Sequence, residues 1–128
     1  MRATKISENI VRYQTEACGV TIYCDVIRAG ADSTIAVYDS VNGHVGCAAL
    51  STARPSLTGS GTGVTTSVLN CLGHKEETIA RMFSEAAAVF HQGTAACTCG
   101  IHIDQINPEQ IAEINRACRK LAEGIWKA

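Results

Sequence analysis

The stretch NPEQIAEINRACRKLAEGI, residues 107–125, carries the clearest pattern in the chain. It predicts a helix, because Asn107 is a natural N-cap, Pro108 suits the first helical position and Gln110 completes a variant of the capping box. One apolar stripe runs along this helix and is formed by Ile111, Ile114, Cys118, Leu121 and Ile125. Another layer has to cover such a stripe, so the preceding segments decide the fold.

A strand and a second helix are predicted just before this stretch. Residues 94–104 predict the strand, and residues 75–91 predict the helix, with Gly93 as its C-terminal cap. Glu76 and Glu77 lie in the first turn of that helix, where the helix dipole favours acidic side chains. Its apolar residues recur at helical spacing and are Ile79, Met82, Phe83, Ala86 and Phe90.

The first half of the chain predicts β-strands. Five runs of strand-forming residues are separated by turn residues and span residues 10–15, 20–28, 33–38, 45–51 and 64–71. Short connections favour antiparallel neighbours, since a parallel crossover needs about a dozen residues. The sequence therefore predicts an α+β fold, with an antiparallel or mixed sheet of about six strands and both helices on one face. The many Ala, Val and Cys residues favour a partner over the other face, and hence a dimer.

Length and composition favour a single domain over residues 1–128. The chain is 46% hydrophobic and 18% charged, which is typical of folded rather than disordered proteins. Its net charge of −1 gives no electrostatic basis for binding nucleic acid. No apolar stretch is long enough to span a membrane, and the N-terminus lacks the apolar core of a signal peptide. We therefore expect a cytoplasmic protein that binds neither nucleic acid nor membranes.

The seven cysteines predict buried thiols rather than disulfides or a metal knuckle. Their number is odd, and the only close pair, Cys97 and Cys99, is too tightly spaced for a usual CxxC metal site. Most of them occupy positions where Ala or Val would fit equally well. We expect them to act as small buried hydrophobic residues in a reducing compartment.

Residues 52–63 predict a long polar loop around Arg54 and Ser56, with glycines at alternating positions. Backbone N–H groups, hydroxyls and a guanidinium can together bind an anion. The loop does not fit a Walker A motif, and it leads into a strand rather than the helix that a dinucleotide fingerprint requires. A surface loop without a ligand is the alternative explanation of this pattern.

The start of the first predicted helix is a second candidate anion site. Gly73, His74 and Lys75 combine free N–H groups, the positive end of the helix dipole and two basic side chains. This combination suits a phosphate or a carboxylate. Ordinary helix capping, with His74 and Lys75 in solvent, is the alternative.

His102 and Asp104 form a third candidate site, because both lie on one face of an extended strand, with the thiols of that strand on the opposite face. A carboxylate beside an imidazole fixes its tautomer, although such pairs also occur without function. His44, His74, His102 and Asp104 could together bind zinc, but their separations show no metal-specific spacing. No GxSxG or other hydrolase signature is present.

Five short motifs occur in the order found in a known family. They are Gly43-His44-Val45-Gly46, Arg54-Pro55-Ser56-Leu57, Thr65-Thr66-Ser67-Val68, Gly73-His74-Lys75-Glu76 and Gly100-Ile101-His102-Ile103-Asp104. Over about residues 10–125 the chain resembles the small LpdD-like proteins. That family is understood to act as chaperones for prenylated flavin mononucleotide (FMN), and its members are often encoded beside UbiD-type decarboxylases.

This resemblance implies a homodimer with a fold like that of the proteasome-assembly chaperones. It also implies a non-catalytic carrier that binds reduced prenylated FMN and delivers it to a UbiD-type decarboxylase. The flavin phosphate would suit Arg54, Ser56, Lys75 and the helix start at His74. As a hypothesis, we assign flavin binding to His44, Arg54, Ser56, Thr66, Ser67, Gly73, His74, Lys75, His102 and Asp104.

For these residues to bind one ligand, the segments around positions 54, 74 and 102 have to share one cleft. Two other functions fit the same residues. A small metal-dependent or His/Asp acid–base enzyme would use the histidines and Asp104 in catalysis. A scaffold subunit of a decarboxylase complex would act without a bound flavin.

Overall fold

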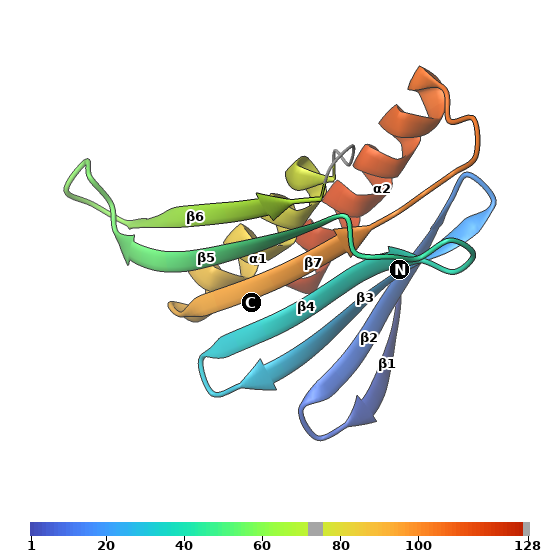
Figure 1. Ribbon diagram of the computed structural model, residues 1–128. Coiled ribbons are helices and arrows are strands. Elements are labelled where there is room, and N and C mark those ends of the chain that lie inside the picture. Colours follow the sequence, from blue (N-terminus) through green and yellow to red (C-terminus); the bar gives the residue numbers. More distant parts are fainter. Residues whose placement is uncertain (72–75, 127–128) are drawn as a thin grey trace.

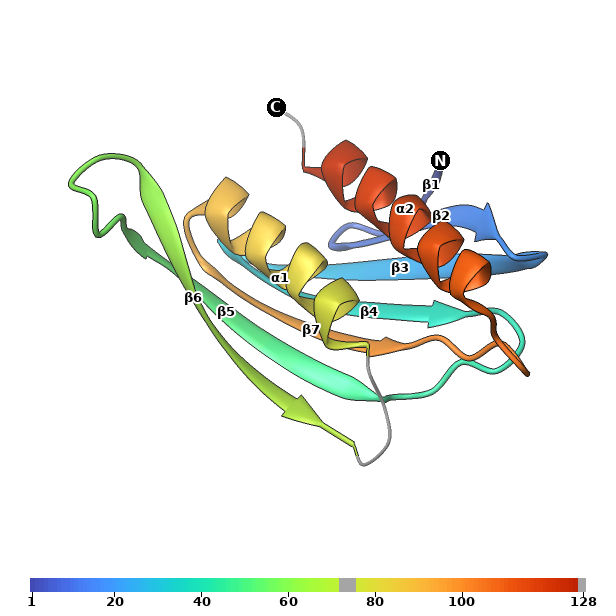
Figure 2. The same ribbon diagram turned by 90° about the horizontal axis from the view of Figure 1, so that it is seen from above.

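The computed structural model describes residues 1–71 and 76–126. A seven-stranded sheet carries two helices on one face and leaves the other face open, as Figure 1 and Figure 2 show. The elements are β1 (Arg2–Ser7), β2 (Ile10–Ala17), β3 (Val20–Ala29), β4 (Asp32–Asp39), β5 (Cys47–Pro55), β6 (Thr62–Asn70), α1 (Glu77–His91), β7 (Thr94–Gly100) and α2 (Pro108–Ile125).

The strand order across the sheet is β1-β2-β3-β4-β7-β5-β6. β4 and β7 are parallel, and every other neighbouring pair is antiparallel. The predicted α+β fold, with a mixed sheet and two helices, is confirmed, although the sheet has seven strands instead of six. Neither helix in the described part of the chain is long and apolar enough to cross a membrane.

The strand that the sequence did not reveal is β1, at one edge of the sheet. It pairs only with β2, and every one of its residues except the half-buried Thr4 is exposed. Because an edge strand of this kind adds almost nothing to the core, its sequence shows no alternation of apolar and polar residues.

The prediction that short connections join antiparallel neighbours is wrong for β4 and β5. β7 lies between them, parallel to β4 and antiparallel to β5. The connection, residues 40–46, crosses the end of β7, where the backbone N–H groups of His44 and Gly46 donate to Gly100 O and Cys99 O. β7 has the sequence TAACTCG, and its small side chains suit a central strand packed under α1.

The predicted long loop at residues 52–63 is instead the tip of the β5–β6 hairpin. Both strands extend into it, and only residues 56–61 form the turn. Gly59 and Gly61 have φ angles of 87° and 78°, in the left-handed region that favours glycine. Two of the alternating glycines therefore mark a tight turn, and Arg54 lies within a strand.

The core lies between the helices and the sheet. Phe83 of α1 and Leu121 of α2 share it with Ile22, Ile35 and Val37 of the sheet, and each of these residues is at most 1% exposed. Burial of such apolar side chains contributes about 1.5–3 kcal/mol each. This two-layer core holds the strands rigidly, so the loops at the strand ends have fixed starting points.

Five cysteines belong to this core, as predicted, and all seven are free thiols in this structure. The buried ones are Cys24, Cys47, Cys97, Cys99 and Cys118. Burial raises the pKa of Cys47 to about 11 and that of Cys118 to about 12. These thiols therefore stay protonated at neutral pH and pack as small hydrophobic groups, whereas Cys18 is partly exposed and Cys71 is exposed.

The helix ends largely follow the sequence signals. The predicted capping box is present, since the Asn107 side chain accepts from Gln110 N at 2.8 Å and the Gln110 side chain accepts from Asn107 N at 3.0 Å. At the end of α1 the left-handed residue is Gln92 rather than the predicted Gly93. Phe90, one of the apolar residues at helical spacing in α1, is 42% exposed.

Candidate functional site

Two loops and the start of α1 meet at one end of the sheet, here called the histidine end. It comprises residues 40–46, residues 101–107 and Glu76, which precedes α1. His44 Nε2 lies 3.3 Å from Glu76 Oε1, and His44 Nδ1 lies 3.1 Å from Asn42 O. Because a carbonyl oxygen can only accept, Nδ1 carries a proton and donates to Asn42. The imidazole of His44 is therefore held from both sides.

His102 lies beside His44 at this end. The two ring centroids are 6.5 Å apart with the rings nearly perpendicular, and His102 Nε2 is 2.9 Å from Asp104 Oδ1. The predicted proximity of His102 and Asp104 is confirmed, although β7 ends at Gly100 and both residues lie in a loop. The His102 side chain is 55% exposed, so a ligand can reach it.

Asp39, which the sequence analysis did not single out, fixes both loops. It ends β4, is only 2% exposed, and accepts backbone hydrogen bonds from Val41, Asn42 and His102. Asn42 Nδ2 adds a bond to His102 O at 3.2 Å. An aspartate at a strand end that precedes a turn ending in Asn-Gly is a recognised turn signal, and it could have identified this residue.

Two glycines allow the loops to approach this closely. A Cβ on Gly100 would overlap the carbonyl oxygen of His44, and a Cβ on Gly43 would lie 2.7 Å from Asp39 O. Neither distance is tolerated by a real side chain, so both positions require glycine for space. The glycines quoted in the sequence motifs therefore support the packing of the histidine end.

A polar cluster on the open face of the sheet lies next to the histidine end and supports its loop at Gly43. Arg12 donates from Nε and Nη2 to the two Asp25 oxygens at 2.8 and 3.0 Å, and Tyr38 Oη donates to Asp25 Oδ2 at 2.7 Å. Burial alone would raise the pKa of Asp25, but the hydrogen bonds from Arg12 and Tyr38 outweigh it and lower the pKa. The Tyr38 ring also lies directly against Gly43.

Arg54 lies at the opposite end of the same sheet. It is seven residues beyond Cys47 along β5, which at roughly 3.3 Å per residue separates it from the histidine end by about 23 Å. Its guanidinium donates to Thr65 Oγ1, Pro55 O and Val64 O at 2.9–3.3 Å. The prediction of one cleft shared by Arg54 and His102 is therefore wrong within a single chain, because the hairpin carries Arg54 away.

Ser56 stays with Arg54 at the hairpin. Its hydroxyl lies 2.8 Å from that of Thr58 inside the turn, and it accepts from Thr58 N at 3.2 Å. The polar groups at this end thus bind mainly to one another. We call this part of the molecule, residues 54–65, the hairpin end.

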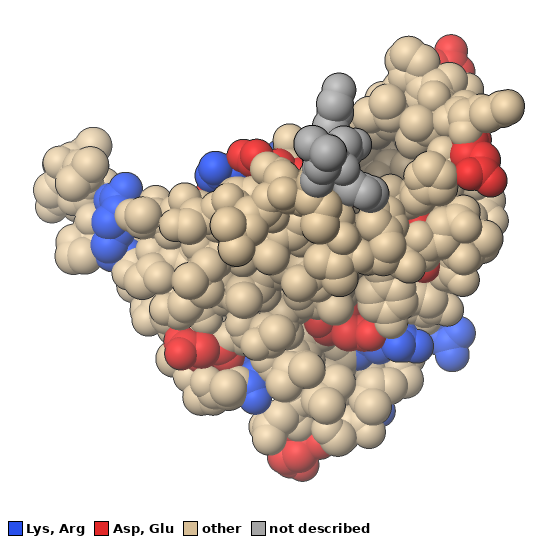
Figure 3. Space-filling model, in the orientation of Figure 1, with Lys and Arg blue, Asp and Glu red and all other residues tan. Residues whose placement is uncertain are grey.

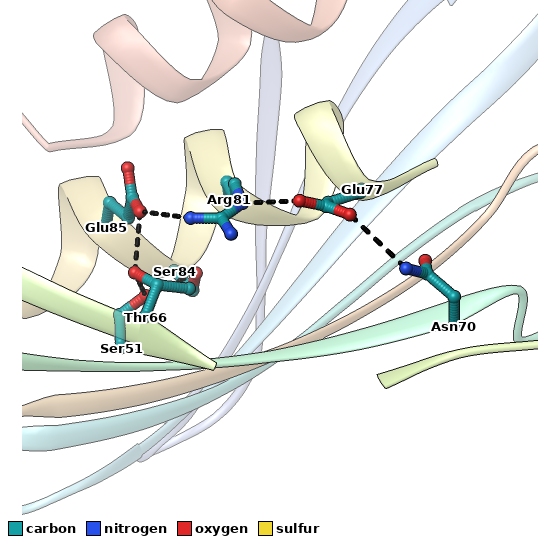
Figure 4. Close-up of polar contacts among 7 residues, drawn as sticks. All are labelled: Ser51, Thr66, Asn70, Glu77, Arg81, Ser84 and Glu85. Atoms are coloured by element: carbon teal, nitrogen blue, oxygen red, sulfur yellow. Dashed lines mark hydrogen bonds and ion pairs between the residues drawn. The ribbon is translucent and has the colours of Figure 1, made fainter. Parts of the chain in front are cut away.

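Thr66 belongs to a chain of hydrogen bonds that ties β5 and β6 to α1 (Figure 4). Thr66 Oγ1 donates to Glu85 Oε2 at 2.6 Å and lies 2.8 Å from Ser51 Oγ, which lies 2.7 Å from Ser84 Oγ. A hydroxyl group has one hydrogen, and Thr66 donates it to Glu85. Ser51 therefore donates to Thr66, and Ser84 donates to Ser51. Ser51 and Ser84 are fully buried. The Thr66 hydroxyl is thus committed to the fold.

Arg81 continues this network along α1, where it contacts Glu77 and Glu85 at 2.9 and 3.4 Å. Asn70 of β6 then donates to Glu77 at 3.3 Å. Ser67 lies outside the network, because it follows Thr66 in β6 and points to the opposite face of the sheet, where it is exposed. Thr66 and Ser67 therefore do not line one site together.

The remaining predicted binding residues, Gly73, His74 and Lys75, lie outside the described residues. The zinc hypothesis also depended on His74. Among residues 1–71 and 76–126, no group of three or more His, Cys, Asp or Glu side chains is arranged to hold a metal ion. The histidine end thus contains two oriented imidazoles and two carboxylates in separate pairs.

The chain is an α+β protein with a mixed seven-stranded sheet and two helices on one face, and a solved structure has a similar fold. It is similar to a chain in the crystal structure of a novel chaperone complex for yeast 20S proteasome assembly, with a TM-score of 0.58 and 10% sequence identity. The similarity covers 91% of this chain and 92% of the other. At this identity the comparison establishes the fold alone. No curated protein matches the sequence.

The family is established by a separate comparison. Residues 16–128 match the prenylated flavin chaperone LpdD-like domain. The chain belongs to this family, and the resemblance inferred from the five motifs is confirmed. A family of flavin chaperones favours a binding role over catalysis.

Proposed function

We propose that this protein binds reduced prenylated FMN at the histidine end and delivers it to a UbiD-type decarboxylase in the cytoplasm, without catalysing a reaction. The observation that carries this proposal is membership in the prenylated flavin chaperone family across residues 16–128. At the histidine end, the side chains of His44 and His102 come together from two distant segments of the chain.

The geometry of the histidine end supports binding of a flat, polar-edged ring. The imidazoles of His44 and His102 are oriented by Asn42 and Asp104 before any ligand arrives, which reduces the entropy cost of binding. The exposed His102 ring offers its Nδ1, the nitrogen that does not face Asp104, to the polar edge of a flavin, and a few such anchors suffice to orient a ring. We therefore propose His44, His102 and Asp104 as residues of the flavin site.

The phosphate contacts of Gly73, His74 and Lys75 remain a prediction. These residues immediately precede Glu76 in the sequence, and the Glu76 carboxylate contacts His44 at 3.3 Å. Arg54 and Ser56 are not part of this proposed site, because they lie at the hairpin end of the same chain.

An anaerobic titration tests the proposal. Reduced prenylated FMN and reduced unmodified FMN are added separately to the protein, and binding is followed by absorbance and calorimetry. We expect saturable binding that is tighter for the prenylated flavin, followed by activation of an apo-decarboxylase when the loaded protein is added. Lack of binding to either flavin would reject the carrier role, and metal analysis of the purified protein would then test the zinc enzyme as the alternative.

We further propose that the protein is a homodimer formed through the open face of the sheet. Figure 3 shows this face, where the surface over β4, β7, β5 and β6 is largely free of charged side chains. Leu50 and Leu69 lie on it with exposures of 51% and 78%, next to the small residues Ala48 and Ala96. Two large exposed leucines on a surface with few charged side chains are typical of an interface.

Light scattering after size exclusion tests the dimer. The wild type is expected at twice the chain mass of 13.5 kDa. The double variant Leu50→Lys/Leu69→Lys is expected to be monomeric, because two lysines per chain would be buried without partners. A monomeric wild type, or a variant that still dimerises, would place the interface elsewhere or remove it.

A further inference from the structure

The helix layer contains an open hollow of about 460 Å³ that the flavin site does not use, here called the helix groove. It lies between the C-terminal half of α1 and the C-terminal turn of α2. Five apolar residues line it, and they are Ala86, Val89, Phe90, Ala122 and Trp126. Glu85 and Glu123 complete the lining.

The charges of the helix groove are negative. Glu123 makes no hydrogen bond or ion pair with any other residue among those described. Glu85 receives Thr66 and Arg81 on Oε2, whereas its other oxygen points away from the sheet in Figure 4. Both helices also end here, and the C-terminal end of a helix carries partial negative charge. None of the lining residues is Lys or Arg.

The aromatic wall of the groove is fixed in place. The His91 ring packs edge-on against Trp126 at 5.5 Å and against Phe90 at 4.8 Å. Arg28 Nη1 lies 3.0 Å from His91 Nε2, and burial together with the Arg28 charge lowers the pKa of His91. Trp126 Nε1 is buried and has no acceptor among the described residues. The rings of the wall are therefore packed against one another, and among the described residues the Trp126 donor is unused.

We propose that the helix groove binds a basic amphipathic helix of a partner protein. A large apolar side chain of that helix would insert between Phe90 and Trp126, and flanking Lys or Arg side chains would pair with Glu85 and Glu123. Helix-in-groove recognition combines an apolar anchor with complementary charge in this way. A dianionic flavin phosphate is repelled by the same carboxylates, so the groove is not a second flavin site.

The helix groove is separate from the proposed flavin site. Val89 lies twelve residues beyond Glu77 on α1, about 18 Å at a rise of roughly 1.5 Å per residue, while the histidine end contacts the start of this helix. A partner could therefore dock on the groove while the histidine end stays accessible. This proposal goes beyond flavin binding and does not depend on it.

Trp126 is the only tryptophan in the chain, so its fluorescence reports on the groove directly. The probe is a short synthetic amphipathic helix of leucine and lysine, and the control probe has glutamate in place of lysine. We expect the basic helix to shift the Trp126 emission to shorter wavelength in a saturable manner. The acidic helix is expected to leave the emission unchanged.

Charge-matched variants then locate the binding. Glu123→Lys is expected to weaken binding of the basic helix about tenfold or more, since like charges would face each other. Ala86→Arg places a cation in the groove and is expected to have a similar effect. Glu8→Lys makes the same charge change in the β1–β2 turn, where Glu8 forms an ion pair with Lys5, and is expected to have no effect.

Three outcomes would overturn the proposal. They are the absence of any emission change with the basic helix, an equal response to the acidic helix, and an equal loss of binding in Glu8→Lys and Glu123→Lys. Flavin titration of Glu123→Lys is expected to match the wild type. Failure of the groove proposal and failure of the carrier proposal are therefore distinguishable.

Discussion

β4 begins and ends with an aspartate, and the two residues hold very different structures. Asp32 lies at the end of β4 away from the histidine end. It is exposed and accepts one backbone hydrogen bond, from Thr94 N at 2.9 Å. Asp39 at the histidine end is 2% exposed and accepts three backbone bonds from two loops. The same residue type thus caps one end of a strand loosely and organises a site at the other end.

Arg54 at the hairpin end and the histidines at the histidine end also differ in how far their side chains are already bound by neighbouring residues. Arg54 donates its hydrogen bonds to its own hairpin, so its guanidinium is already occupied. His44 and His102 belong to separate loops that are held together by Asp39, and the His102 ring remains exposed. The exposed His102 ring can receive a ligand while its contact with Asp104 stays in place, and for this reason we propose the histidine end as the binding site.

Replacing the two aspartates is expected to give the largest difference between the ends. Asp39→Ala leaves three backbone N–H groups without an acceptor and should lower the free energy of unfolding by about 3–4 kcal/mol. Asp32→Ala, the matched control, should cost about 1 kcal/mol, because solvent replaces its single bond. Urea unfolding followed by circular dichroism measures both. Equal losses in the two variants would show that Asp39 does not organise the histidine end.

Acid should weaken the histidine end through Asp25. The pKa of Asp25 is lower in the folded protein than in the unfolded chain, so its stabilising effect is complete above the unfolded pKa of about 4. That effect is lost as the pH falls toward the lower folded pKa. Asp25→Asn should cost about 1–2 kcal/mol at neutral pH and make the stability less sensitive to acid.

Urea unfolding of wild type and Asp25→Asn at several pH values between neutrality and acid tests this expectation. Asp32→Asn makes the same substitution on the exposed end of β4 and is the matched control. Parallel curves for wild type and Asp25→Asn would mean that other carboxylates cause the acid sensitivity.

The fold was more predictable from sequence than the site was. The capping box at Asn107 and Gln110 depends on neighbouring residues, and the structure contains it. The sheet order was not predictable, because the position of β7 between β4 and β5 is set by long-range packing of its small side chains. Local patterns report local structure, whereas neighbours in a sheet are chosen by the whole core.

The candidate site shows the same limit. The sequence motifs identified His44, His102 and Asp104, which the fold brings together. They also suggested Arg54, because glycine-rich polar sequence around an arginine looks the same in a binding loop and in a hairpin turn. Asp39 was missed because its role depends on a hydrogen bond to His102, 63 residues away in the chain.

Loss of the His44 imidazole is expected to weaken flavin binding about tenfold, or about 1.4 kcal/mol, because this ring lies beside His102 and ties its loop to Glu76. The backbone of His44 stays in place in His44→Ala, since its carbonyl still packs against Gly100. Anaerobic calorimetry with reduced prenylated FMN measures the affinity, and thermal unfolding checks that the fold is retained. Unchanged affinity in both His44→Ala and His102→Ala would move the flavin site away from this end.

Arg54→Ala is expected to have the smallest effect, and it tests whether the hairpin end takes part in flavin binding. Its lost hydrogen bonds are all at the partly exposed hairpin end, so the cost in stability should be about 1 kcal/mol or less. Flavin affinity should stay within about twofold of the wild type, because roughly 23 Å separates Arg54 from the histidine end. If Arg54→Ala weakens flavin binding as strongly as His44→Ala, the two ends must meet across two chains. Mixing flavin-binding-deficient Arg54→Ala and His44→Ala chains would then restore part of the binding, since such a mixed dimer keeps one intact composite site.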